Sequence, residues 1–304
     1  MQVTVLSPGL FATIQDRGRF GYIASGIGPS GAMDAVALEA ANWLVGNRPD
    51  EAVLEATLLG PTLLFEKDCI CALTGADMGA RIGSKPVPRY QPFWVQAGQT
   101  LTLGAAVTGC RGYLALQGGI QLPPELGSRS TNLKCALGGY AGRALRRGDQ
   151  LPVPDETHPN CIDRRRRPVT YDQQVEVRVI PGPQADAFPQ SAFDTLTSAS
   201  FTLTDQSDRM GLRLTGPVIE TVNGSDIISD GIALGAIQIT SAGQPIILMA
   251  DRQTTGGYAK IGTVCTVDLP KLAQLRPGGT VRFSLITVEQ AQRLLRKKKW
   301  RLFK

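Results

Sequence analysis

Glycine and proline interrupt this sequence so often that long helices cannot dominate its fold. The 304 residues include 34 glycines and 20 prolines, and both residue types disfavour the interior of a helix. Short apolar or alternating runs, rich in β-branched residues, lie between them and predict strands. These runs are residues 2–6, 69–73, 99–103, 112–116, 175–180, 236–240, 245–249 and 280–286. We therefore expect a mainly β protein of barrels or curled sheets with a few short helices.

Two segments have the pattern of a helix. From about residue 30 to residue 45, apolar residues recur at helical spacing, with Ser30 as the expected N-cap and Gly46 at the end. A second helix is expected to begin at Thr287, because "TVEQ" places Gln290 at the third position of a capping box.

A segment rich in proline and charge, residues 152–168, predicts a linker between two domains. The two halves share faint echoes, including Gly-Pro, Leu-x-Gly-Pro and Ala-Gly-Gln, which suggest two related β domains. The predicted division is an N-terminal domain at 1–155, a linker at 156–168, a C-terminal domain at 169–295 and a basic tail at 296–304.

The net charge of +6 is unevenly placed along the chain. Four arginines at 164–167 and seven basic residues from Arg293 onward leave only 21 basic against 26 acidic residues elsewhere. A nucleic-acid interface needs positive charge spread over a folded face, so we expect no nucleic-acid partner. No apolar run approaches the ~20 residues that span a bilayer, and the first residues do not resemble a signal peptide. We expect a cytoplasmic protein without membrane contact.

Cysteine and histidine offer little for catalysis or metal binding. The six cysteines contain no Cys-x-x-Cys pair and are expected to be reduced and mostly buried. The single histidine, His158, lies in the predicted linker. Histidine-based triads and multi-histidine metal sites are therefore not expected, and no metal site is predicted.

Two glycine-rich stretches resemble nucleotide-binding loops without meeting their requirements. "GIGPSG" at 26–31 matches Gly-x-Gly-x-x-Gly, but the residues before it are polar and strands dominate the chain after it. "GARIGSKP" at 79–86 has the wrong spacing for a phosphate-binding loop, and Pro86 prevents the helix that should come next. We therefore identify no nucleotide site in this chain.

Polar clusters at predicted strand ends are the best candidates for a site. The most polar is "DRQTTGGY" at 251–258, and others are "QDRGR" at 15–19 and "GSRST" at 127–131. They supply arginine, aspartate, glutamine, hydroxyl groups and a tyrosine, which suits binding of a carboxylate, an amide or a phosphate. Each cluster taken alone is more often a polar turn or a buried ion pair than a binding site.

Taken in order, the clusters resemble the allophanate hydrolase subunit 2 (KipA) family of biotin-dependent carboxyltransferase-like proteins, and most closely its 5-oxoprolinase branch. The resemblance extends from about residue 13 to residue 265. The matching stretches are "TIQDRGRFGY", "GIGPSGAMDAVALEAANWLVGN", "LEATLLGPTL", "LTGADM", "GYLALQGGI", "LGSRSTN", "SDRMGLRL", "SDGIALGAIQI" and "LMADRQTTGGYAKIGTV".

The resemblance implies two cyclophilin-like β-barrel domains and work within a complex. In the 5-oxoprolinase branch the partners would be a KipI-like protein and a LamB/YcsF-like protein. That complex opens the lactam of 5-oxoproline to L-glutamate with ATP, and this chain would be inactive alone. The alternatives are the carboxyltransferase part of a biotin-dependent urea or amide carboxylase and a non-catalytic regulator of a kinase inhibitor. The chain has no Met-Lys-Met biotin acceptor and no ATP-grasp region, which favours 5-oxoprolinase over a carboxylase.

The resemblance and the hydrogen-bonding inventory together predict one cleft. Asp251 and Arg252 are its expected catalytic residues, with Arg252 binding a carboxylate or phosphate and Asp251 orienting it or accepting an amide N–H. The alternative is that Asp251 and Arg252 form a buried ion-pair network. The expected substrate-binding residues are Gln253, Thr254, Thr255 and Tyr258, with Gln15, Asp16 and Arg19 or Ser128, Arg129 and Ser130 as a second wall.

Overall fold

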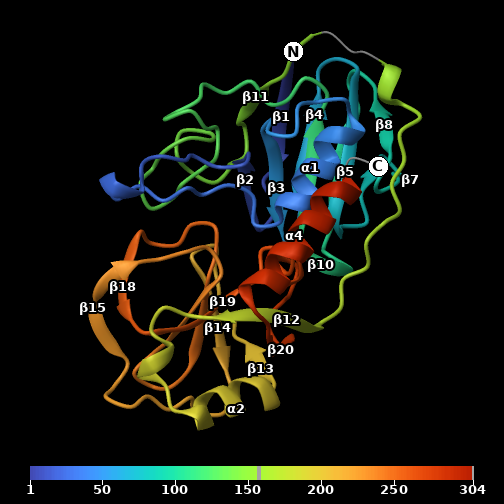
Figure 1. Ribbon diagram of the computed structural model, residues 1–304. Helices are drawn as coiled ribbons and strands as arrows, with labels where there is room; N and C mark the ends of the chain where they lie inside the picture. The colour runs from blue at the N-terminus through green and yellow to red at the C-terminus, as the bar shows by residue number, and fades with distance from the viewer. Residues whose placement is uncertain (156–158, 303–304) are drawn as a thin grey trace. The chain divides into compact units, whose positions relative to one another are not determined.

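The computed structural model describes residues 1–155 and 159–302, and these form two compact units. Unit 1 contains Met1–Tyr22 and Pro29–Tyr171, and unit 2 contains Ile23–Gly28 and the chain from Asp172 onward. Strands outnumber helices in both units (Figure 1), so the prediction of a mainly β fold is confirmed. All eight segments predicted as strands are strands.

Unit 1 consists of two sheets with a helix. One sheet has the order β11-β1-β4-β9-β6-β7 and the other has the order β2-β3-β10-β5-β8. The bounds are β1 Gln2–Ser7, β2 Phe11–Gln15, α1 Ala35–Leu44, β3 Val53–Thr57, β4 Thr62–Phe65, β5 Cys69–Asp77, β6 Arg81–Ile82, β7 Lys85–Pro86, β8 Pro92–Val95, β9 Thr100–Thr102, β10 Thr108–Leu116, β11 Gln150–Pro152 and a 3-10 turn at Pro159–Cys161.

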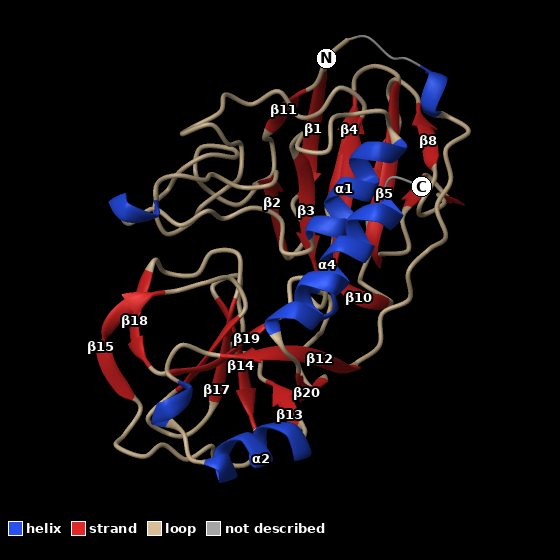
Figure 2. Cartoon of the chain, in the orientation of Figure 1, coloured by secondary structure: helices blue, strands red, loops and turns tan. Residues whose placement is uncertain are grey.

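The core of unit 1 lies between its two sheets. Strand β5 shows the alternation, because Cys71 joins the apolar cluster shared by both sheets whereas Ile70 packs with α1 on the other face. Helix α1 covers that outer face across β5 and β10 (Figure 2). Both faces of this sheet are therefore buried, which explains the continuous apolar run of β5.

Unit 2 is built around a closed barrel of order β12-β19-β16-β17-β14-β13-β20, and β15 and β18 form a separate two-stranded ribbon. The barrel is antiparallel except where β12 pairs with β20 in parallel. The bounds are β12 Gln174–Pro181, α2 Gln190–Ser198, β13 Phe201–Leu203, β14 Gly211–Thr215, β15 Asp226–Gly231, β16 Ala236–Ile239, β17 Pro245–Leu248, β18 Thr255–Tyr258, β19 Lys260–Val264, α3 Leu269–Ala273, β20 Thr280–Leu285, α4 Val288–Leu302, and 3-10 turns at Ile23–Ser25 and Ala185–Ala187.

The two helix starts show what local sequence can determine. The capping box of α4 is confirmed, since the Thr287 N–H donates to Gln290 Oε1 at 2.9 Å and the Gln290 N–H donates to Thr287 Oγ1 at 3.3 Å. The prediction of Ser30 as the N-cap of α1 is wrong. Asp34 caps that helix through the N–H groups of Val36 and Ala37, and Ser30 instead has a left-handed φ of 55°.

The described part of the expected linker packs on unit 1. Cys161 is buried there, Arg164 Nη1 donates to the Trp43 carbonyl oxygen, and the Arg166 N–H donates to the Tyr90 carbonyl oxygen at 2.9 Å. Residues 156–158, including His158, lie outside the described residues. The segment expected to be a basic tail continues α4 as far as Leu302.

Two further expectations concern cysteines and membranes. All six cysteines are free, and all except Cys135 are buried, as predicted. Among residues 1–155 and 159–302, no helix combines the length and the apolar character required to cross a bilayer.

Candidate functional site

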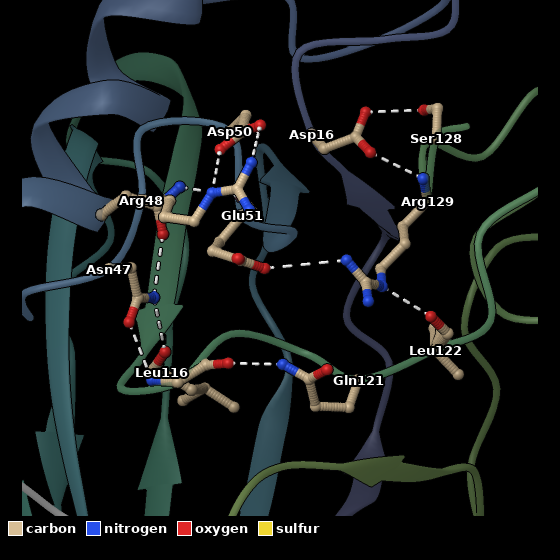
Figure 3. Close-up of polar contacts among 12 residues, drawn as sticks. Asp16, Asn47, Arg48, Asp50, Glu51, Leu116, Gln121, Leu122, Ser128 and Arg129 are labelled. Atoms are coloured by element: carbon tan, nitrogen blue, oxygen red, sulfur yellow. Dashed lines mark hydrogen bonds and ion pairs between the residues drawn. The ribbon is translucent and has the colours of Figure 1, made fainter.

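Asp16 is the centre of a polar cluster in unit 1, at the point where β2 ends. Its Oδ1 accepts from the hydroxyl of Ser128 at 2.7 Å, from the hydroxyl of Ser130 at 2.5 Å and from the N–H of Gly18 at 2.7 Å. Its Oδ2 accepts from the Arg129 N–H at 2.6 Å (Figure 3). Four uncharged donors thus satisfy a carboxylate that is only 8% exposed and fix the loop at 128–130 to the end of β2.

The Arg129 side chain turns away from Asp16. Its Nε donates to the Leu122 carbonyl oxygen at 2.5 Å, and its Nη1 lies 3.6 Å from Oε2 of Glu51 (Figure 3). The backbone of Arg129 therefore belongs to the Asp16 cluster, whereas its guanidinium lies beside the carboxylate of Glu51.

Gln15 and Arg19 flank Asp16 in the sequence, and both are buried. Gln15 Nε2 donates to Thr13 Oγ1 at 3.0 Å and to the Thr131 carbonyl oxygen at 3.2 Å. Arg19 Nη2 donates to the Ser130 carbonyl oxygen at 2.5 Å. Within the described residues, Gln15 Oε1 and the Nε and Nη1 atoms of Arg19 have no hydrogen-bond partner. The structure thus brings all six predicted residues of unit 1 into one cluster.

Asp251 in unit 2 pairs with an arginine that the sequence pattern did not indicate. Arg209 Nε lies 2.8 Å from Asp251 Oδ2, and Arg209 Nη2 lies 3.1 Å from Oδ1. Both side chains are less than a tenth exposed, and the Asp251 N–H also donates to the Arg209 carbonyl oxygen at 2.9 Å. Asp251 is therefore held in a buried two-point ion pair across the turns that flank β14 and β17.

Arg252, the next residue, has no carboxylate partner among the described residues. Its Nε donates to the Ile232 carbonyl oxygen at 3.1 Å and its Nη1 to that of Met249 at 3.3 Å. The residue is 9% exposed, and burial lowers the pKa of Arg252 from its ordinary value. The alternative of an Asp251–Arg252 ion pair is not what the structure contains. Arg252 is instead a positioned cation whose charge the described side chains leave uncompensated.

The rest of "DRQTTGGY" forms a ribbon with β15. Thr255 pairs with Gly231 and Tyr258 with Asp226, and the Thr254 carbonyl oxygen accepts from the Ile232 N–H at 3.0 Å. A Cβ on Gly256 would lie 2.7 Å from Ile232 Cδ1 and 2.8 Å from Gln238 Nε2. Close packing inside unit 2 thus accounts for this glycine, while the predicted binding residues of the segment are partly or largely exposed, namely Gln253, Thr254, Thr255 and Tyr258.

Two charged groups of unit 2 were missed at the level of sequence. Besides Arg209, Lys260 is only 2% exposed and donates from Nζ to Asp230 Oδ2 at 2.9 Å. This hydrogen bond is the main cause that lowers the pKa of Asp230. The stretches "SDRMGLRL" and "LMADRQTTGGYAKIGTV" contain Arg209 and Lys260, and their polar residues at strand ends were the only available signal.

Two cavities lie elsewhere in the units, and no predicted site residue lines either of them. The cavity of unit 2, about 420 Å³, is lined by Gln174, Val175, Glu176, Ser200, Thr280 and Arg282. The cavity of unit 1, about 440 Å³, is lined by Val45, Gly46, Asn47, Arg48, Glu51, Gln117, Gly118, Asn160, Cys161 and Arg164. Figure 3 shows how Glu51 lies between Arg48 and Arg129.

The predicted residues thus form two groups, one in each unit. The six residues of unit 1 share the Asp16 cluster, and the six residues of unit 2 belong to the segment from Asp251 to Tyr258. Each group contains a buried arginine without a carboxylate partner among the described residues. The single cleft lined by both groups stays a prediction.

Residues 25–285 match the family model described as carboxyltransferase domain, subdomain A and B. The chain is 37% identical to the C subunit of the 5-oxoprolinase of Escherichia coli (strain K12) over 98% of both chains. It is 41% identical to the protein of that name in Haemophilus influenzae, over 94% of this chain and 92% of the relative.

A longer relative and a solved structure of another protein complete the comparison. Identity to the "Urea amidolyase" of Lachancea kluyveri is 33%, over 95% of this chain but only 17% of that protein. The crystal structure of the urea carboxylase of Kluyveromyces lactis matches with a TM-score of 0.90 and 31% identity, covering 98% of this chain and 28% of that chain. With its match to the family model across both units, the chain belongs to the carboxyltransferase domain family, subdomain A and B.

Proposed function

We propose that this chain is the C subunit of an ATP-dependent 5-oxoprolinase, which opens the lactam of 5-oxoproline to L-glutamate. The observation that carries the proposal is identity of 37% and 41% to two proteins of that name along nearly their whole length. The geometry agrees with a small anionic substrate, since each unit contains a buried arginine that no described carboxylate neutralises.

The partners proposed for this complex are a KipI-like protein and a LamB/YcsF-like protein, which would act with this chain in the cytoplasm. The chain would be inactive without them. ATP does not fit the glycine-rich stretch at 79–86, because β6 and β7 form a hairpin there and no helix follows to receive a phosphate. We therefore assign ATP to the complex rather than to that loop of this chain.

Arg252 is the proposed anion-binding group of unit 2, for a carboxylate or a phosphate. Two backbone carbonyl groups orient its guanidinium while leaving its charge unneutralised. Asp251 acts on this position through the backbone rather than by pairing with Arg252, because both of its oxygens bind Arg209. It is therefore a positioning residue in this proposal.

A second candidate function is the carboxyltransferase part of a biotin-dependent urea or amide carboxylase. The observation that favours it is the TM-score of 0.90 with the Kluyveromyces lactis urea carboxylase. This function requires biotin on another chain and a carboxyl group transferred from it.

One assay separates these functions. The purified chain is tested for glutamate release from 5-oxoproline, with ATP, alone and with the proteins encoded beside it. We expect release only from the combination. Full activity of the chain alone contradicts its dependence on partners. Absence of release in every combination, together with carboxylation of urea by a biotin-containing partner, supports the second function, and absence of both leaves a non-catalytic regulator.

Arg252→Lys tests the proposed anion contact. A lysine keeps the charge but not the planar fork, so we expect the variant complex to lose activity about 10- to 100-fold, as for loss of one hydrogen bond to a charged group. Its melting temperature should stay close to that of the wild type, because no described carboxylate loses its partner. A large fall in melting temperature with normal activity of the folded fraction would remove Arg252 from the site.

A further inference from the structure

Arg19 is a buried cation with most of its donors unused. The residue is 1% exposed, and its Nη2 donates to the Ser130 carbonyl oxygen. A guanidinium has five N–H donors, and the three on Nε and Nη1 have no partner among the described residues. No described carboxylate lies within ion-pair distance of it. Because a buried charge without a counter-charge is costly, this position favours an anion.

Two further unpartnered polar atoms belong to the same neighbourhood. Gln15 Oε1 and Ser30 Oγ are buried without a hydrogen-bond partner in the described structure. Gln15 Nε2 donates to the carbonyl oxygen of Thr131, and Arg19 Nη2 donates to that of the preceding residue, Ser130. The Arg19 N–H donates to the Pro29 carbonyl oxygen at 2.7 Å, immediately before Ser30. The segments 15–19, 29–30 and 130–131 thus meet at one place, which we call the Arg19 junction. They bring a cation, an amide oxygen and a hydroxyl group to it.

The junction is rigid on the side of Arg19. A Cβ on Gly138 would clash with Arg19 Nη2 and with the Ser130 carbonyl oxygen, and this glycine has a φ of 65°. Only glycine therefore fits behind the guanidinium. Asp16 accepts from the hydroxyl of Ser130, the residue whose carbonyl oxygen binds Arg19. The donors of Arg19 are oriented before any ligand arrives, which reduces the entropy cost of binding.

We propose that Arg19, Gln15 and Ser30 form a subsite for a small carboxylate with a neighbouring amide N–H, the chemistry of a lactam acid. Arg19 donates to the carboxylate, Gln15 Oε1 accepts the lactam N–H, and the hydroxyl of Ser30 completes the contact. The inference deepens the proposed function and rests on it for the choice of 5-oxoproline. In this assignment the Arg252 guanidinium binds a phosphate group and not the carboxylate of 5-oxoproline.

Calorimetric titration of the full-length chain with 5-oxo-L-proline tests the subsite. We expect Arg19→Met to weaken binding about 10- to 100-fold, as for loss of a charged hydrogen bond. Arg81→Met, in the exposed β6–β7 hairpin, is the matched control and should leave binding unchanged. 2-Pyrrolidinone has no carboxylate and should be insensitive to Arg19→Met. N-methyl-5-oxoproline has no N–H and should be insensitive to Gln15→Met, which should weaken binding of 5-oxoproline itself.

Thermal unfolding distinguishes a ligand-binding arginine from a structural one. The ligand-free Arg19→Met variant should melt at the same temperature as the wild type or above it, because an unpaired buried charge is removed. The rise in melting temperature that 5-oxoproline gives the wild type should be absent. A lowered melting temperature with undiminished affinity overturns the inference, as does absence of binding to the wild-type chain at millimolar concentration. If binding depends on Arg19 but the complex releases no glutamate, the proposed function fails and the subsite stands.

Discussion

Asp16 in unit 1 and Asp251 in unit 2 are both buried carboxylates, but they are stabilised by different partners. Asp16 accepts from two serine hydroxyls and two backbone N–H groups, all uncharged. Asp251 binds the guanidinium of Arg209 at two points. Neutral donors satisfy a carboxylate without placing a positive charge beside it, whereas the guanidinium of an ion pair balances the carboxylate charge.

In each unit, one buried arginine close to the aspartate in the sequence does not pair with it. Arg19 and Arg252 are both left without a described carboxylate partner, although each lies within three residues of an acid. Proximity along the chain therefore does not predict pairing. Two buried arginines remain whose charge can act on a ligand.

The strongest test of this comparison is to break the ion pair of unit 2. Arg209→Met should lower the free energy of unfolding by about 3–5 kcal/mol, because it leaves the buried carboxylate of Asp251 without a counter-charge. Arg252→Met leaves no described carboxylate unpaired and removes only donors to the carbonyl oxygens of Ile232 and Met249, so it should cost less, about 1–3 kcal/mol. Denaturant unfolding of both variants measures the contrast.

The double variant Arg209→Met/Asp251→Asn is the control for that experiment. Removing the carboxylate charge should restore part of the stability lost in Arg209→Met, since an amide is less costly to bury than an ion. Equal losses for Arg209→Met and Arg252→Met would contradict the division between a structural and a ligand-binding arginine.

The support behind Arg19 is the second test. Gly138→Ala places a Cβ against Arg19 Nη2 and the Ser130 carbonyl oxygen, while Gly148→Ala, with a φ of 90°, meets no atom within 4 Å. Both variants incur left-handed strain of about 1–2 kcal/mol. Gly138→Ala should cost about 1–3 kcal/mol more, as expected for overpacking. Equal unfolding free energies for the two variants would show that the Arg19 junction is not tightly packed.

The smallest effect concerns acid stability, where the two units should behave alike. Burial raises the pKa of Asp268 and of Asp149, but hydrogen bonds from Arg178 and Arg143 bring both below their ordinary value. A lowered pKa stabilises the folded state above the unfolded value of about 3.9, and this contribution disappears as the pH falls through the folded pKa.

Replacing either carboxyl by an amide should therefore flatten the loss of stability below about pH 4. Unfolding measured at about pH 7 and about pH 3 should show a smaller difference for Asp268→Asn and for Asp149→Asn than for the wild type. The effect is modest, because both arginines are partly exposed and solvent screens them. An unchanged pH dependence in both variants would assign acid sensitivity to other groups.

Much of the architecture was predictable because it depends on local pattern. Alternation and β-branched runs identified the strands, and the Thr287–Gln290 capping box marked the start of α4. The order of the polar motifs identified the family, which the match at residues 25–285 confirms. Local rules were insufficient at Ser30, where a left-handed turn and a better acceptor at Asp34 moved the start of α1.

The partners of the buried charges were decided only by the tertiary structure. Asp251 pairs with Arg209, 42 positions away, rather than with its neighbour Arg252. The carbonyl oxygen bound by Arg19 belongs to Ser130, 111 positions away. The sequence by itself determined which residue types gather at strand ends, because turns and strands are local. Which of them neutralise one another and which keep a free charge depends on distances across the fold, because an ion pair forms only where folding brings two charges into contact.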